Sequence, residues 1–248
     1  MSTIAPGAKL SQRIARQIAA EIAQRGLRPG DKLDSESAML ARYSVGRPSL
    51  REALRILEDQ GLIILKPGPG GGPVVAAMGT HDFGRVASLY FQTAGTTLRE
   101  LGEALVVIEP VMARQAAARA TSAGRSELRA HLEQVRHQVP GQATLVAGTD
   151  EFHRMVAQLS GNGVLGLVAT AVRELYEERV LATIYAVHGP AFVESAEKTF
   201  DTHDAIAAAI LAGRGARAES LMRTHVLEFI SGNEERFPEL LDQVITWQ

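Results

Sequence analysis

The segment from Ser35 to Gly61 constrains the fold more than any other part of the chain, because it sets two helix patterns around a very short turn. Asp34 or Ser35 can cap the first helix, which runs through Tyr43. Ser44-Val45-Gly46 has room only for a turn. Pro48 then suits the start of a second helix, and Gly61 can take the left-handed conformation after its end. This spacing predicts a helix-turn-helix.

The second of these helices has two distinct faces. Leu50, Leu54 and Leu57 form one apolar stripe. Hydrogen-bond donors crowd its first two turns: Arg47, Ser49, Arg51 and Arg55. A helix that buries one stripe and presents arginines near its N-terminus is suited to the major groove of DNA. The alternative is a solvated helix with an ordinary run of charge.

The flanking segments favour the DNA-binding interpretation. Leu10 to Gln24 predicts an amphipathic helix, with isoleucines every four residues. After Gly61, Leu62 to Leu65 is β-rich, KPGPGGGP predicts a tight loop, and Val74-Val75 predicts a return strand. A helix-turn-helix followed by such a hairpin is a winged helix.

Charge is divided unevenly along the 248 residues. Residues 1–80 carry 11 Lys and Arg against 7 Asp and Glu, whereas the remainder carries 15 against 21. This division indicates a polyanion-binding module joined to an acidic body. The chain has no cysteine, which excludes disulfides and thiolate metal sites. It also has no long apolar run and no signal-peptide pattern, so we expect a cytoplasmic protein without a membrane partner.

From residue 79 onward every periodic segment is helical. We therefore expect a mainly α protein, with a winged helix-turn-helix and its small β-hairpin in residues 1–78 and an all-α bundle in residues 79–248. The predicted helices of the bundle are Asp82–Gln92, Leu98–Ala120, Arg125–Gln138, Ala143–Leu159, Val164–Val187, Phe192–Leu211, Arg217–Ile230 and Pro238–Trp247.

Three of the seven histidines, His153, His203 and His225, lie on apolar faces of three different predicted helices. Such a set could supply imidazole ligands to Zn²⁺, Ni²⁺ or Fe²⁺. Three core histidines with ordinary hydrogen bonds are the alternative. The other four lie in breaks or among polar neighbours, and we interpret them as structural or solvated.

The N-terminal pattern resembles the winged helix-turn-helix of the GntR family of bacterial transcription regulators. The similar segments are RPGDKL, SESAMLARYSVGRPSLREALRILEDQGLI and KPGPGGGPVV. The resemblance implies that Arg47, Ser49 and Arg51 contact operator DNA. It also implies that Lys66 and the wing glycines, Gly68 among them, approach the DNA backbone. Ser37 and Pro67 stand where family members often carry basic residues.

The remainder resembles the FCD effector-binding domain of the FadR branch of that family. The similar segments are IEPVMARQAAARAT, DEFHRMVAQLSGNGVL and THDAIAAAILAGRGARAESLMRTHV. Family metal sites use an aspartate and three histidines, and the histidines match His153, His203 and His225. Thr149 occupies the aspartate position, with Asp150 one residue later. The resemblance therefore implies a three-histidine metal site completed by water or effector.

Leu105 stands where family members that bind small acids often carry an arginine, which favours a less anionic or more apolar effector. We thus expect a dimeric, ligand-responsive transcription regulator. A repressor would be released from a palindromic operator by a small-molecule effector, and the protein would not be an enzyme. The alternatives are a metal-dependent hydrolase and a metal-sensing regulator that use the three histidines.

Overall fold

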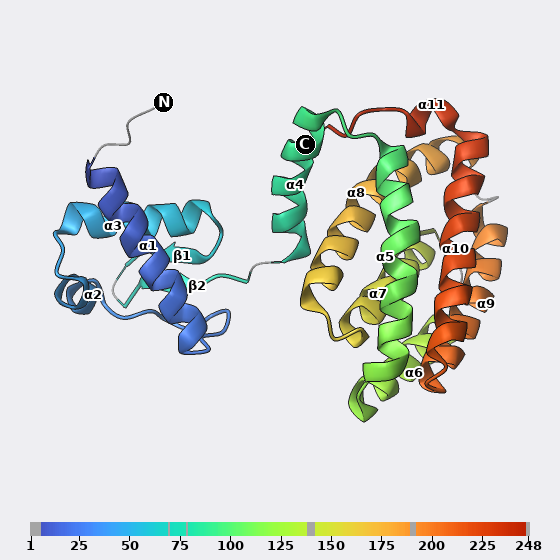
Figure 1. Ribbon diagram of the computed structural model, residues 1–248, viewed down its shortest axis with the longest axis horizontal. Coiled ribbons are helices and arrows are strands. Elements are labelled where there is room, and N and C mark those ends of the chain that lie inside the picture. The colour runs from blue at the N-terminus through green and yellow to red at the C-terminus, as the bar shows by residue number, and fades with distance from the viewer. Residues whose placement is uncertain (1–5, 69, 78, 138–141, 189–191, 247–248) are drawn as a thin grey trace. The chain divides into compact units, whose positions relative to one another are not determined.

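The computed structural model describes residues 6–68, 70–77, 79–137, 142–188 and 192–246. Two compact units divide the chain, Met1–Asp82 and Phe83–Gln248. Figure 1 shows a small helical unit with a short hairpin and a larger all-helical bundle. The mainly α fold predicted from the sequence is confirmed. The domain division at residues 78 and 79 stays a prediction.

The smaller unit begins with three helices, α1 (Pro6–Gln24), α2 (Glu36–Tyr43) and α3 (Arg47–Asp59). Ser35 caps α2 by accepting a hydrogen bond from the Ala38 backbone N–H. Ser44 takes the left-handed conformation that turns the chain toward α3. The apolar stripe of α3 is buried against α1, where it meets Ile14 and Ile18. This stripe fixes which face of α3 remains outside.

The wing consists of β1 (Ile63–Lys66) and β2 (Gly72–Val75), which pair antiparallel. A bridge between Lys32 and Val74 places the short extended segment before α2 against the same hairpin. The left-handed backbone at Gly61, predicted from the sequence, has φ +73° and lets the chain leave α3. The helix-turn-helix with a β-hairpin is thus confirmed.

The larger unit contains eight helices in its described residues: α4 (Thr80–Ala94), α5 (Leu98–Arg119), α6 (Ser122–His137), α7 (Gln142–Leu159), α8 (Gly163–His188), α9 (Phe192–Leu211), α10 (Gly215–Arg236) and α11 (Pro238–Leu241). Figure 1 shows α5 in the middle of the bundle, and it packs against α7, α8, α9 and α10. A central helix of this kind is buried on several sides, which explains why Leu105, Met112 and Ala116 are all in the core. No helix in the described part of the chain is both long and apolar enough to span a bilayer.

The last predicted helix is wrong in length. It ends at Leu241, and the following residues are extended rather than helical. The Leu98 N–H donates to the Gln243 carbonyl, and the Ile245 N–H donates to the Thr96 carbonyl. Backbone pairing with the start of α5 thus competes successfully with helix continuation, a long-range partner that local periodicity cannot reveal. Trp247 lies outside the described residues. The helix predicted over Arg217–Ile230 is longer at both ends.

Candidate DNA interface, metal centre and effector cavity

The exposed side of α3 presents the residues predicted to read DNA. Arg47 and Arg51 are exposed, and Ser49 is partly buried beside the apolar stripe. Arg51 remains 69% exposed although its guanidinium lies 3.6 Å from Glu36. No side chain caps α3, whose N-cap is Gly46. The first backbone N–H groups of α3 therefore point outward with the arginines, an arrangement that suits a phosphate oxygen.

The wing is held by two side chains that the sequence interpretation did not include. Lys32 donates to the Gly70 carbonyl at 2.9 Å, and Glu58 accepts from the Leu65 N–H at 2.9 Å. Lys66 and Gly68, the two residues predicted to approach DNA, are exposed on this hairpin. A Cβ at Gly71 would lie 2.2 Å from the Lys66 carbonyl oxygen, so the turn requires glycine at that position.

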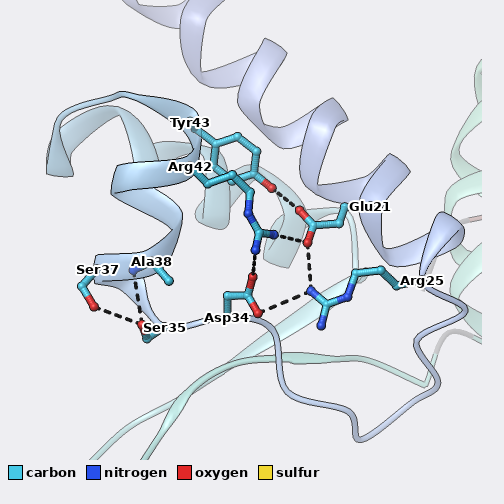
Figure 2. Close-up of polar contacts among 8 residues, drawn as sticks. All are labelled: Glu21, Arg25, Asp34, Ser35, Ser37, Ala38, Arg42 and Tyr43. Atoms are coloured by element: carbon cyan, nitrogen blue, oxygen red, sulfur yellow. Dashed lines mark hydrogen bonds and ion pairs between the residues drawn. The ribbon is translucent and has the colours of Figure 1, made fainter.

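A cluster of charged side chains joins α1 to α2 behind the recognition helix (Figure 2). Glu21 accepts hydrogen bonds from Tyr43 at 2.6 Å, from Arg25 at 2.8 Å and from Arg42. Asp34 pairs with both arginines. The hydrogen bonds from Tyr43 and Arg42 lower the pKa of Glu21 to about 2, and burial raises the pKa of Tyr43 to about 12. The cluster fixes α2 on α1 and so positions α3.

In the larger unit the three predicted histidines come together. His225 Nε2 lies 3.2 Å from His203 Nε2 and 3.2 Å from His153 Nε2. All three ligand nitrogens lie within 4.8 Å of one another. They come from α7, α9 and α10, and the His203 ring stacks on Phe152. The prediction that the three side chains point inward is therefore confirmed by the structure.

Burial keeps these imidazoles neutral. His153 and His203 are buried, and desolvation lowers the pKa of each well below its usual value. Burial also lowers the pKa of His225 to about 3. A neutral imidazole offers a lone pair to a metal ion, whereas the imidazolium does not.

Glu109 on α5 is a buried residue of this centre whose role the sequence interpretation missed. Its Oε2 lies 2.7 Å from His153 Nδ1, although neither atom has an aligned hydrogen-bond partner. Its Oε1 accepts from Arg173 Nε at 2.6 Å, and Arg173 also pairs with Glu177. One signal was available: single charges at Glu109 and Arg173 interrupt otherwise apolar stretches.

The donor set fits a divalent transition metal. Two nitrogens that bind one zinc ion at about 2.0 to 2.1 Å in tetrahedral geometry lie about 3.3 Å apart, close to the observed 3.2 Å. The carboxylate behind His153 would hold its Nδ1–H and leave Nε2 free for the ion. Asp150 does not join the histidines, because its carboxyl hydrogen bonds to Glu177 on α8. Burial and that hydrogen bond raise the pKa of Asp150 to about 8.

A cavity of about 120 Å³ lies beside this centre, between α5, α7 and α8. Glu109, His153, Arg173 and Glu177 form its buried part, and Asp150 lies at its exposed rim. The remaining lining residues are Met112, Glu151, Arg154, Ala157, Ala169, Thr170 and Glu174. His153 is thus the one residue shared by the cavity and the histidine cluster.

A winged helix with an exposed recognition helix, followed by a helical unit with a ligand-sized cavity, defines a ligand-responsive, DNA-binding transcription regulator. Comparison with known proteins agrees. Residues 10–71 match the family model described as bacterial regulatory proteins, gntR family, and residues 100–228, more than half of the chain, match the FCD domain. The chain belongs to the GntR family, in the group that carries an FCD domain.

Among curated relatives, the HTH-type transcriptional repressor NanR of Cronobacter sakazakii is 25% identical over 225 residues, which cover 88% of this chain and 83% of the relative. The HTH-type transcriptional regulator LutR of Bacillus subtilis is 28% identical over 203 residues, covering 81% and 90%. A solved Streptococcus agalactiae GntR structure has a TM-score of 0.70 at 19% identity, covering 90% of this chain and 99% of that chain. That structure supports the fold.

Proposed function

We propose that the protein is a repressor that leaves a palindromic operator when a small molecule binds in its helical unit. The observation that carries this proposal is the pairing of an exposed, arginine-bearing α3 with a cavity lined by buried charged residues. The relatives named as NanR are repressors. A regulator of this kind acts on DNA in the cytoplasm. We infer no catalytic role for any residue.

Arg47, Ser49 and Arg51 are the proposed reading residues of α3. The exposure of the two arginines supports this assignment, since base edges are reached only by side chains that leave the protein surface. Lys66 and Gly68 are proposed to meet the phosphate backbone from the wing. The exposed α3 N-terminus adds backbone N–H donors for a phosphate.

His153, His203 and His225 are proposed to hold one Zn²⁺, Ni²⁺ or Fe²⁺ ion. The ion would neutralise the lone pairs that face one another and would hold α7, α9 and α10 together. Glu109 would orient His153. Effector binding must favour one arrangement of the protein over another, because a ligand with equal affinity for both shifts nothing.

The protein is proposed to act as a homodimer. Phe83, Val86 and Tyr90 recur along one face of α4, and all three are exposed, Tyr90 by 72%. The opposite face of α4 is occupied within the unit, because Gly84 packs against Ala171. An aromatic and aliphatic face of this kind suits a second copy of the chain, and a two-fold dimer matches a palindromic operator.

Operator binding tests the proposal directly. DNA fragments selected from random sequence by the full-length protein should contain two inverted half-sites about one helical turn apart. A metabolite screen by thermal shift, with and without chelator, should then identify a ligand that releases this DNA. No enrichment of any DNA sequence would contradict the proposal.

A metal-sensing regulator is the second candidate, and the clustering of three neutral histidines favours it. The two functions differ in what releases DNA. Titration with zinc alone should change operator affinity in a metal sensor. In the proposed repressor, metal-loaded protein should still need an organic ligand.

A further inference from the structure

The cavity between α5, α7 and α8 has an unusual balance of charge for a site in which a carboxylate ligand might be expected. Its lining contains five carboxyl side chains and two arginines. Both arginines are already paired. Arg173 pairs with Glu109 and Glu177, and Arg154 pairs with Glu151. An entering anion would have to displace a protein carboxylate from an arginine and approach the remaining acidic groups.

We propose that this cavity is the effector site and that it takes an organic cation, a primary ammonium or guanidinium group, recognised by the carboxylates of Asp150 and Glu177. The inference rests on the proposed ligand-responsive function, to which it adds the place and the chemical class of the ligand.

Two carboxyl groups face each other at the mouth of the cavity. Asp150 from α7 hydrogen bonds to Glu177 from α8, so in the absence of a cation the two groups share a proton. Glu177 is buried and Asp150 lies at the rim. A cation placed between them replaces this proton and interacts with both negative charges. The pair is therefore built across two helices, which a surface cluster on one helix is not.

The buried end of the cavity points to a ligand as well. Glu109 is 1% exposed, and its Oε2 has no aligned hydrogen-bond donor. Unsatisfied carboxylate oxygens in protein interiors are costly, and a donor supplied by a ligand removes the cost. The carboxylates thus continue from the rim to the floor.

The apolar part of the lining favours an organic cation over a hydrated metal ion. Met112, Ala157 and Ala169 contribute hydrocarbon to the walls. One water molecule needs about 10 to 15 Å³ by the same kind of measure, so about 120 Å³ admits a short alkyl chain with its charged end. Leu105, in place of an arginine, agrees with a ligand that lacks an essential carboxylate.

The cation site and the histidine cluster are joined by one chain of contacts. His153 faces Glu109, Glu109 binds Arg173, Arg173 binds Glu177, and Glu177 meets Asp150. A ligand that reorganises the Asp150 end can alter how Glu109 holds His153. By linkage, occupancy of either site then changes the affinity of the other by the same factor.

The test uses full-length protein, prepared with zinc and with chelator, and three probes: n-butylamine, diaminobutane and butyrate. Calorimetric titration and thermal shift measure binding, with magnesium chloride as a control for ionic strength and for a simple divalent cation. Asp150→Asn keeps the shape of the side chain and removes its charge. Glu178→Gln, an exposed change on α8 outside the cavity lining, is the matched control.

We expect at least one amine to bind wild type and Glu178→Gln alike, to bind Asp150→Asn about tenfold more weakly, and to exceed butyrate and magnesium. Butyrate or magnesium binding as tightly as the amines would overturn the inference, as would equal amine binding by wild type and Asp150→Asn. Wild type that binds operator DNA but no amine also overturns it, and leaves the proposed function standing. Amine binding that depends on Asp150, in protein that binds no DNA, would instead contradict the proposed function.

Discussion

Glu21→Gln should loosen the DNA-binding unit at neutral pH and leave it nearly unaffected in acid. The substitution preserves size but removes the charge that holds Arg25, Arg42 and Tyr43. The pKa of Glu21 is lowered from 4.5 to about 2. A depressed carboxylate pKa stabilises the folded state above about pH 4.5, and the stabilisation is lost as the pH falls through about 2.

The size of the effect follows from the same pKa. At about 1.4 kcal/mol per pKa unit, the difference between 4.5 and about 2 sets an upper bound of about 3 kcal/mol. The Glu21 side chain is 23% exposed, and its arginine partners are more exposed still. Solvent screening therefore reduces the expected loss to about 1 kcal/mol.

Hydrogen exchange of the full-length protein measures this loss in the right unit, because peptides from α1 and α2 report local opening separately from the helical bundle. At pH 7 their amides should exchange about fivefold faster in Glu21→Gln than in wild type. The difference should shrink between pH 4.5 and pH 2. Glu52→Gln, an exposed change on α3, should exchange like wild type. Equal rates at pH 7, or a difference that persists unchanged in acid, would refute the role assigned to Glu21.

Four further outcomes are expected. Arg47→Ala and Arg51→Ala should each weaken specific operator binding by about 1 to 3 kcal/mol without unfolding the chain, as footprinting and circular dichroism would show. Gly71→Ala should weaken DNA binding through the wing, because its Cβ meets the Lys66 carbonyl; wild-type affinity would contradict this. His203→Ala should carry less zinc than wild type by elemental analysis after dialysis, and equal contents would leave three core histidines. Tyr90→Glu should shift sedimentation toward the monomer, and an unchanged dimer would place the interface elsewhere.

Local patterns were sufficient to predict the smaller unit. Ser35 and Gly61 act through their immediate neighbours, so capping and turn chemistry identified them without any tertiary information. The inward direction of His153, His203 and His225 was also predictable, because apolar periodicity reports which face of a helix is buried.

Long-range contacts were not predictable in the same way. Glu109 and Arg173 lie 64 positions apart, and their pairing depends on how α5 meets α8. The fate of Asp150 was similarly out of reach, since its partner Glu177 belongs to another helix. The end of the chain shows the same limit: the extended residues after Leu241 are set by a partner at Thr96.

That last pairing has a consequence for genetics. The strand-like residues Gln243 to Ile245 hydrogen bond to the junction between α4 and α5, and α4 is the helix through which the chain enters the bundle from the DNA-binding unit. Ile245 is buried there. Selections for strains that no longer respond to inducer should therefore return substitutions in this tail, far in sequence from both the operator-reading residues and the ligand, because the tail anchors the joint between them.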